Sequence, residues 1–175
     1  KRWDGSQKTR PIFTSPAFIA PRKGSVIGRI VIDYRAVNRS LLPVPLPSPN
    51  AQAIFDALKG HRLYFQSDLS LAYNLVELDE ETSRLLAVCT KSGVFLPLRL
   101  PLGPSPAPGY FQDVIQRIFG DVTEVFIDDI AFGTSEDEQF LARLAKVFQA
   151  CGTSGARLSL RKAFLGAPSI DCLGH

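Results

Sequence analysis

Two adjacent carboxylates, Asp128 and Asp129, stand inside an otherwise apolar stretch that favours β-structure. Their neighbours in EVFIDDIAFGTS (124–135) are mostly valine, isoleucine and phenylalanine. A buried carboxylate is costly unless it is paired or binds a cation. Carboxylate oxygens are the ligands that hard divalent cations prefer. The pair therefore indicates a metal site, with an exposed Asp-Asp turn as the alternative, because Asp is common in turns.

The elements after residue 63 predict how a third carboxylate, Asp68, joins this pair. The patterns indicate a strand over 63–70, a hairpin over 84–100 that turns at 91–93, and a helix in the second half of 101–120. Two strands are expected around the acid pair. They are followed by a helix that has a Ser135–Glu138 capping box and ends near Gly152, and by a last strand over 156–160. Without the hairpin the order is βαββαβ, the ferredoxin-like split unit. Its neighbouring antiparallel strands bring Asp68 beside the acid pair. Three such acids are stable together around divalent cations, which can assist a phosphoryl displacement.

The segments before residue 63 predict a strand, a connector and a helix. GRIVIDYRAV (28–37) is rich in β-branched residues and predicts a strand. Prolines alternate through LLPVPLPSPN (41–50), which excludes a helix or a central strand and favours an extended connector. NAQAIFDALKG (50–60) predicts a short helix, with Asn50 as the N-cap and Gly60 as the stop.

Charge is spread unevenly over a chain of 175 residues, whose apolar content of 45% is enough for one domain or two small lobes. Residues 1–39 hold nine lysines and arginines against two acids, whereas residues 121–138 hold seven acids and no base. A basic lobe beside an acidic patch suits a polyanion held near bound metal ions. Two solvated surfaces remain the alternative.

Cysteine usage and hydropathy exclude several classes of protein. The three cysteines and two histidines are scattered, so neither a disulfide framework nor a zinc site is expected, and a reducing intracellular compartment is favoured. No apolar stretch approaches the roughly 18 residues of a membrane span, so no membrane partner is expected. The chain contains no methionine, even at position 1, which indicates a piece of a longer protein.

Eight ordered motifs give the chain a resemblance to a known family. They are SPAFIAPRK (15–23), RIVIDYRAVN (29–38), PVPLP (43–47), SDLSLAY (67–73), LPLGPSPAPGYFQ (100–112), FIDD (126–129), RLSLRKAF (157–164) and LGH (173–175). In this order they resemble the fingers–palm region of reverse transcriptases from long-terminal-repeat retrotransposons and retroviruses. The resemblance implies an α+β right-hand polymerase fold, with a ferredoxin-like palm whose antiparallel sheet carries helices on one face.

The resemblance also implies a division of the chain into four segments. Residues 1–62 would be a fingers segment and connector, 63–83 palm, 84–107 a fingers hairpin and loop, and 108–175 palm. The match stops at LGH, where the primer grip of the family begins. The thumb, connection and RNase H regions of the family have no counterpart in these 175 residues.

Individual roles follow from the resemblance, position by position. Asp68, Asp128 and Asp129, with the backbone carbonyl of Leu69, would hold two Mg²⁺ ions, which Mn²⁺ can replace. Lys162 matches a lysine that can act as a general acid on departing pyrophosphate, with a surface lysine as the alternative. The implied substrate-binding residues are Arg22, Lys23 and Arg29 at the triphosphate, Arg35 near the template, and Ser70, Leu71, Ala72, Tyr73 and Leu102 around the nucleotide.

Tyr73 stands where the family keeps an aromatic steric gate against a 2′-OH, and an ordinary core aromatic is the alternative. For the basic residues the alternative is a solvated surface. The chain departs from the family pattern at Phe126, where a tyrosine is usual, and in the pocket at Leu71, Leu75, Leu102 and Pro106. These departures leave the acids intact and alter the surroundings of the nucleotide.

The implied function is RNA-directed DNA polymerisation, in which a primer 3′-OH attacks the α-phosphate of a deoxynucleotide. Its partners would be an RNA or DNA template with primer, dNTPs, and the missing regions of a longer polyprotein. A catalytically weak or domesticated retroelement module, serving RNA binding or a structural role, remains an alternative. An RNA-dependent RNA polymerase shares the palm but fits Tyr73 and FIDD poorly.

Overall fold

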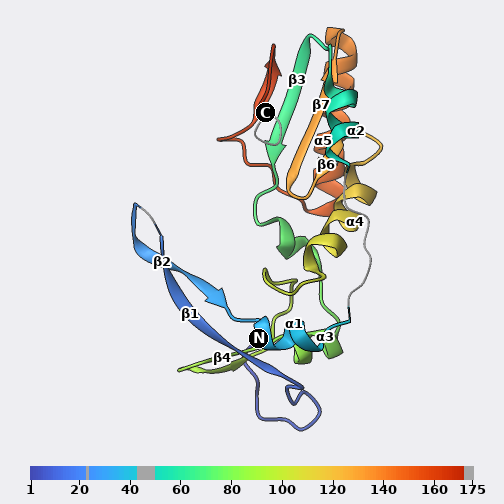
Figure 1. The fold of residues 1–175 in the computed structure, drawn as a ribbon. Coiled ribbons are helices and arrows are strands. Elements are labelled where there is room, and N and C mark those ends of the chain that lie inside the picture. The colour runs from blue at the N-terminus through green and yellow to red at the C-terminus, as the bar shows by residue number, and fades with distance from the viewer. Residues whose placement is uncertain (23, 43–49, 172–175) are drawn as a thin grey trace. The chain divides into compact units, whose positions relative to one another are not determined.

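A computed structural model describes residues 1–22, 24–42 and 50–171 (Figure 1). The chain divides into two compact units, one made of residues 1–45 with 76–107 and the other of residues 46–75 with 108–175. Each unit is built around a four-stranded sheet. The predicted proline-rich connector lies mainly at 43–49, outside the described residues. In the parts of the chain that the structure describes, no helix is long and apolar enough to cross a membrane.

The first unit packs short helices beside a mixed sheet in the order β2-β1-β4-β5. Its elements are β1 (Thr14–Arg22), β2 (Ser25–Ile32), α1 (Arg35–Ser40), α3 (Glu80–Leu85), β4 (Ala87–Thr90) and β5 (Gly93–Phe95). β1 runs antiparallel to β2 and parallel to β4. Tyr34, Val37 and Leu86 form a buried cluster, and the Tyr34 hydroxyl donates to the Leu86 carbonyl at 3.0 Å.

One expectation for this unit is wrong in part, one helix was overlooked, and one expectation is confirmed. The strand predicted over 28–37 is wrong beyond Ile32, because the Asp33 carboxylate accepts from the Arg35 backbone N–H at 3.1 Å and turns the chain into α1. The sequence-based reading also overlooked α3, whose N-cap Asp79 accepts from the Thr82 N–H at 2.8 Å. The hairpin turning at 91–93 is confirmed as β4 and β5.

The second unit contains the predicted βαββαβ order. Its elements are α2 (Ala51–Leu58), β3 (Leu63–Asp68), the 3₁₀ helix η1 (Ala72–Leu75), α4 (Ala107–Phe119), β6 (Glu124–Phe126), β7 (Asp129–Thr134), α5 (Asp137–Ser154) and β8 (Phe164–Ala167). The strands pair antiparallel in the order β6-β7-β3-β8, as Figure 1 shows for β6, β7 and β3. This order is that of a ferredoxin-like sheet, so the predicted topology is confirmed.

Both ends of α5 differ from the sequence expectation. The capping box is wrong, since the N-cap is Glu136 and it makes no side-chain cap hydrogen bond. The helix ends at Ser154, followed by Gly155 at φ +76°, a left-handed conformation in which glycine is favoured.

The last strand was expected over 156–160 and instead forms at β8. In the expected segment, Leu158 makes only an isolated bridge with Leu69. The segment lies beyond the end of β3, so it has no strand to extend alongside. The helix predicted over 50–60 is confirmed as α2, with Asn50 accepting from the N–H groups of Gln52 and Ala53.

Strand alternation separates an aromatic core from the acids. Phe65 of β3 stacks on its β7 partner Phe132 with ring centroids 5.2 Å apart, and Phe132 contacts Phe140 of α5 at 5.4 Å. Because successive side chains of a strand point to opposite faces, Asp68 and Asp129 lie on the face turned away from α5. The position of the core thus determines which face presents the carboxylates.

We expect Phe132→Ala to lower the free energy of unfolding by about 3–5 kcal/mol, because it removes the ring between Phe65 and Phe140. Phe148→Ala on α5 is the matched control, since that ring is 47% exposed and should change stability by less than about 1 kcal/mol. Urea denaturation of the chain measures both values. Equal losses for the two variants would contradict this description of the core.

Candidate active site

Asp68 and Asp129 oppose each other across two neighbouring strands. Asp68 is the last residue of β3, and its partner in the antiparallel register is Asp129, the first residue of β7. Directly opposed residues have Cβ atoms about 4.5–5.5 Å apart, which leaves two carboxylates within reach of one another. The site therefore begins as a pair of like charges at the end of the sheet.

The third carboxylate, Asp128, belongs to the two-residue turn between β6 and β7. Phe126 pairs with Asp129, so Ile127 and Asp128 form the connection. Ile127 has φ +56°, the positive value that a type II′ turn needs at its first central position. A β-branched residue is rare in this conformation, so its neighbours must hold it there.

Backbone hydrogen bonds fix the acid-bearing strand end from both sides. The Leu69 N–H donates to the Asp128 carbonyl at 2.7 Å, and the Ser159 N–H donates to the Asp68 carbonyl at 2.8 Å. The Ser70 N–H donates to the Arg157 carbonyl at 2.7 Å. Residues 157–159, which were expected to form a strand, instead brace the chain around Asp68.

Lys162 neutralises one of the acids directly. Its Nζ donates to Asp68 Oδ2 at 2.5 Å. This hydrogen bond is the main reason why the pKa of Asp68 lies below its usual value, and it raises the pKa of Lys162 in return. The lysine predicted to act in catalysis therefore contacts a predicted metal ligand.

The pKa of Asp129 is shifted in the opposite direction, upward. Burial raises its pKa to about 6, and its hydrogen bond with Asp68 and the charges of Asp68 and Asp128 add to the shift. Crowding of acids disfavours the charged form of the carboxyl, and a bound cation reverses that effect.

The carboxylate oxygens of the three acids are suitable ligands for a hard cation, although they are not arranged as a complete set of metal ligands. Among the described residues, no group of three or more His, Cys, Asp or Glu side chains is arranged to hold a metal ion. Asp68 and Asp129 supply opposed oxygen ligands, while Asp128 is exposed on the turn. A cation bound through Asp68 Oδ2 would compete with Lys162 for that oxygen. The predicted separation of the Asp68 and Asp128 carboxyl groups, and the role of the Leu69 carbonyl, stay predictions.

Tyr73 lies between the core and the acids. It belongs to η1, and its ring stacks on Phe111 of α4 at a centroid distance of 4.5 Å. Burial raises the pKa of its hydroxyl, with a further contribution from the Asp128 charge. The preceding residues differ in exposure, since Leu71 is exposed at φ +52° and Ala72 is buried.

The remaining predicted site residues belong to the first unit. Arg29 is exposed on β2, and Leu102 is exposed in the segment before α4. The exposed Arg35 donates its Nε and Nη2 to Asp33 at 2.8 and 2.6 Å, and these bonds lower the pKa of Asp33 to about 2. Arg22 ends β1, and Lys23 lies outside the described residues. Their participation in one site with the acids stays a prediction.

Gln112 of α4 is a residue that sequence reasoning overlooked. It is buried, and its side chain bonds to the backbone of the acid-bearing turn. The sequence offers only a weak signal for this role: Gln112 is a polar residue directly after Phe111, which lies on the apolar face of a predicted helix.

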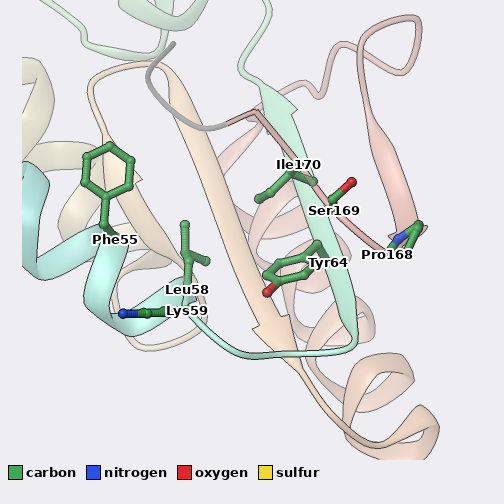
Figure 2. Close-up of a pocket in the computed structure, with 7 residues that line it drawn as sticks. All are labelled: Phe55, Leu58, Lys59, Tyr64, Pro168, Ser169 and Ile170. Atoms are coloured by element: carbon green, nitrogen blue, oxygen red, sulfur yellow. The ribbon is translucent and has the colours of Figure 1, made fainter. Parts of the chain in front are cut away.

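A separate hollow of about 310 Å³ lies at the other end of β3, beside Tyr64. Figure 2 shows the side chains of Phe55 and Leu58 of α2, and of Lys59 just after it, on one side and residues 168–170 on the other. None of the three carboxylates lines it, so this hollow is not part of the acid site.

Comparison with known proteins places this geometry in a family. Residues 21–175 match the reverse transcriptase (RNA-dependent DNA polymerase) family. The retrovirus-related Pol polyprotein from transposon 297 of Drosophila melanogaster is 30% identical over an alignment of 171 residues, which covers 93% of this chain and 16% of that polyprotein. The chain therefore spans less than a fifth of this relative.

Solved structures of a foamy viral protease-reverse transcriptase share the fold. A complex with double-stranded DNA and a complex with an RNA/DNA hybrid both give a TM-score of 0.84 at 24% identity, covering 94% of this chain and 29% and 22% of those chains. The expected α+β right-hand polymerase fold and the resemblance to retroelement enzymes are confirmed. The chain belongs to the reverse transcriptase family.

Proposed function

We propose that the chain is the fingers–palm core of an RNA-directed DNA polymerase. The observation that carries the proposal is the opposition of Asp68 and Asp129 at the end of a ferredoxin-like sheet, next to the turn that holds Asp128. In this proposal residues 1–62 and 84–107 contribute the fingers and the connector, and residues 63–83 and 108–175 contribute the palm. The reaction is attack of a primer 3′-OH on the α-phosphate of a dNTP, with release of pyrophosphate.

The acids would hold the metal ions of this reaction. Asp68, Asp128, Asp129 and the carbonyl of Leu69 would bind two Mg²⁺ ions, with Mn²⁺ as a substitute. When bound, the ions would supply neutralisation of charge on the attacking and leaving oxygens. The position of Asp129 supports this assignment, because burial first, and then the neighbouring acids Asp68 and Asp128, raise its pKa, and a shared cation would offset both effects.

Other residues of the second unit would position the nucleotide. Tyr73, held by its stack on Phe111, would act as the steric gate beneath the sugar, and Ser70, Leu71 and Ala72 lead to it. Lys162, which like any ordinary lysine is protonated at neutral pH, would donate a proton to departing pyrophosphate.

Residues of the first unit would contact phosphates. Arg22, Lys23 and Arg29 would bind the triphosphate, and Leu102 would line the nucleotide pocket. Arg35 would contact the template strand after leaving Asp33, with which it pairs in the free chain. Such contacts read backbone charge and not sequence, so base pairing would determine the product.

The proposed partners are a primer annealed to an RNA or DNA template, dNTPs, and further regions of a longer polyprotein such as a thumb and an RNase H region. The foamy viral enzyme, crystallised with double-stranded DNA and with an RNA/DNA hybrid, supports the nucleic-acid part. The small share of the transposon 297 polyprotein that the chain spans supports the polyprotein part.

A second candidate is a catalytically weak or domesticated module that binds RNA or serves a structural role. Lys162 on Asp68 favours it, together with the absence of a finished metal cluster among the described residues. RNA binding without primer extension, in a protein completed by its flanking regions, would establish this alternative over the polymerase.

In a complete polymerase that carries this core, Asp68→Asn or Asp128→Asn should lower primer extension by about 10²–10³-fold or more, because each removes charge stabilisation at the reacting phosphate. Asp121→Asn is the control, an exposed acid outside the site. Extension assays in Mg²⁺, with circular dichroism to verify folding, provide the measurement. Near-normal extension by either site variant would refute the two-metal assignment.

Tyr73→Ala should raise ribonucleotide incorporation relative to deoxynucleotide incorporation, because the ring that blocks the 2′-OH is gone. Tyr73→Phe keeps the ring and its stack on Phe111, and should keep sugar discrimination. Single-nucleotide incorporation kinetics compare the two sugars. Unchanged discrimination in the alanine variant would leave Tyr73 as a packing residue.

Lys162→Ala should slow single-turnover chemistry more than it weakens dNTP binding, since a proton donor acts in the transition state. Lys162→Arg should rescue the rate poorly, because a guanidinium does not readily release a proton. Rapid-quench kinetics across dNTP concentrations separate the two effects. If arginine restored full chemistry, the contribution of Lys162 would be positive charge alone.

A further inference from the structure

The side chain of Gln112 spans the turn that carries the acid pair. Its Oε1 accepts from the Ile127 backbone N–H at 2.6 Å, and its Nε2 donates to the Val125 carbonyl at 3.2 Å. Gln112 is only 7% exposed, so water competes little for these bonds. One amide group thus satisfies two backbone groups on either side of Phe126.

These two backbone groups belong to an edge of the sheet. β6 is the terminal strand in the order β6-β7-β3-β8, so only β7 pairs with it. The Gln112 amide supplies a donor and an acceptor where a further strand would have done so. It also holds the residue with φ +56°, a conformation that an isoleucine does not keep without support.

α4 presents Gln112 from a rigid position. Phe111, Ile115 and Phe119 of the same helix are completely buried. Phe111, the residue next to Gln112, stacks on Tyr73. One turn of α4 therefore supports both Tyr73 and the acid-bearing turn.

We propose that Gln112 is a positioning residue, which holds the Ile127–Asp128 turn so that Asp128 and Asp129 are presented for cation binding. The part of the inference that concerns the cation rests on the proposed function. The part that concerns the turn rests on geometry alone. The chemistry requires glutamine, because its amide offers one acceptor and one donor at the same end. Glutamate keeps the acceptor and loses the donor, and leucine loses both.

The first test measures amide hydrogen exchange of the metal-free chain by NMR in Gln112→Leu, Gln112→Glu and the wild type. In Gln112→Leu the Ile127 amide should exchange about fivefold faster or more, as expected for one lost hydrogen bond. The Phe132 amide reports on global opening and should change much less. Gln112→Glu should keep Ile127 protected, because its carboxylate still accepts. Gln116→Leu, at an exposed position of α4, should match the wild type.

The second test measures Mn²⁺ affinity by electron paramagnetic resonance of the free ion. Gln112→Leu should bind Mn²⁺ about fivefold more weakly or worse, and Gln116→Leu should not differ from the wild type. Unchanged Ile127 exchange in Gln112→Leu would overturn the inference. Faster exchange with unchanged Mn²⁺ affinity would also overturn it, since Gln112 would then only stabilise the turn.

A wild-type chain that binds no Mn²⁺ would refute the proposed metal site itself. The exchange measurement would still decide whether Gln112 holds the turn, so the two failures are distinguishable. If Gln112→Leu does not fold, the comparison of Gln112→Glu with the wild type decides instead: faster Ile127 exchange with retained Phe132 protection would overturn the acceptor role.

Discussion

Repulsion between carboxylates is the constraint around which the second unit is organised. The register of β3 and β7 forces Asp68 against Asp129, and the adjacent turn adds Asp128. Three interactions offset this repulsion: buried aromatic packing on the opposite face of the sheet, backbone hydrogen bonds around Asp68, and the ammonium group of Lys162 bound to Asp68. An arrangement that opposes its own electrostatics persists in a folded protein when the same atoms serve binding or catalysis.

α4 connects the parts of this arrangement that lie far apart in the sequence. Through Phe111 it supports Tyr73, and through Gln112 it supports the acid-bearing turn. Displacement of this helix would therefore disturb Tyr73 and the acid-bearing turn together.

The sequence predicted the βαββαβ order and the helix α2, because these depend on local periodicity and on a strong N-cap at Asn50. It did not predict the end of β2, where the single side chain of Asp33 turns the chain, or the start of α5, whose N-cap Glu136 makes no side-chain cap hydrogen bond. The last strand was misplaced because pairing depends on where β3 ends, which a local pattern does not contain.

The site shows the same division between local and long-range information. The acids were found from their unusual place in an apolar run, and the convergence of Asp68 on the acid turn followed from strand order. The pairing of Asp68 with Asp129 specifically depends on register, and the ion pair with Lys162 joins residues 94 positions apart. Gln112 was overlooked because a side chain that completes a sheet edge leaves no periodic signal.

The contact between Lys162 and Asp68 means that a divalent ion, if it binds as proposed, would meet a carboxylate that already binds an ammonium group. The acid cluster is partly neutralised before any metal arrives, so the folded state does not depend on metal to offset its repulsion. A divalent ion that used Asp68 Oδ2 would compete with Lys162 for that oxygen. If the ion took it, the ammonium group of Lys162 would stay beside the acids, within reach of a phosphate group held by the ion.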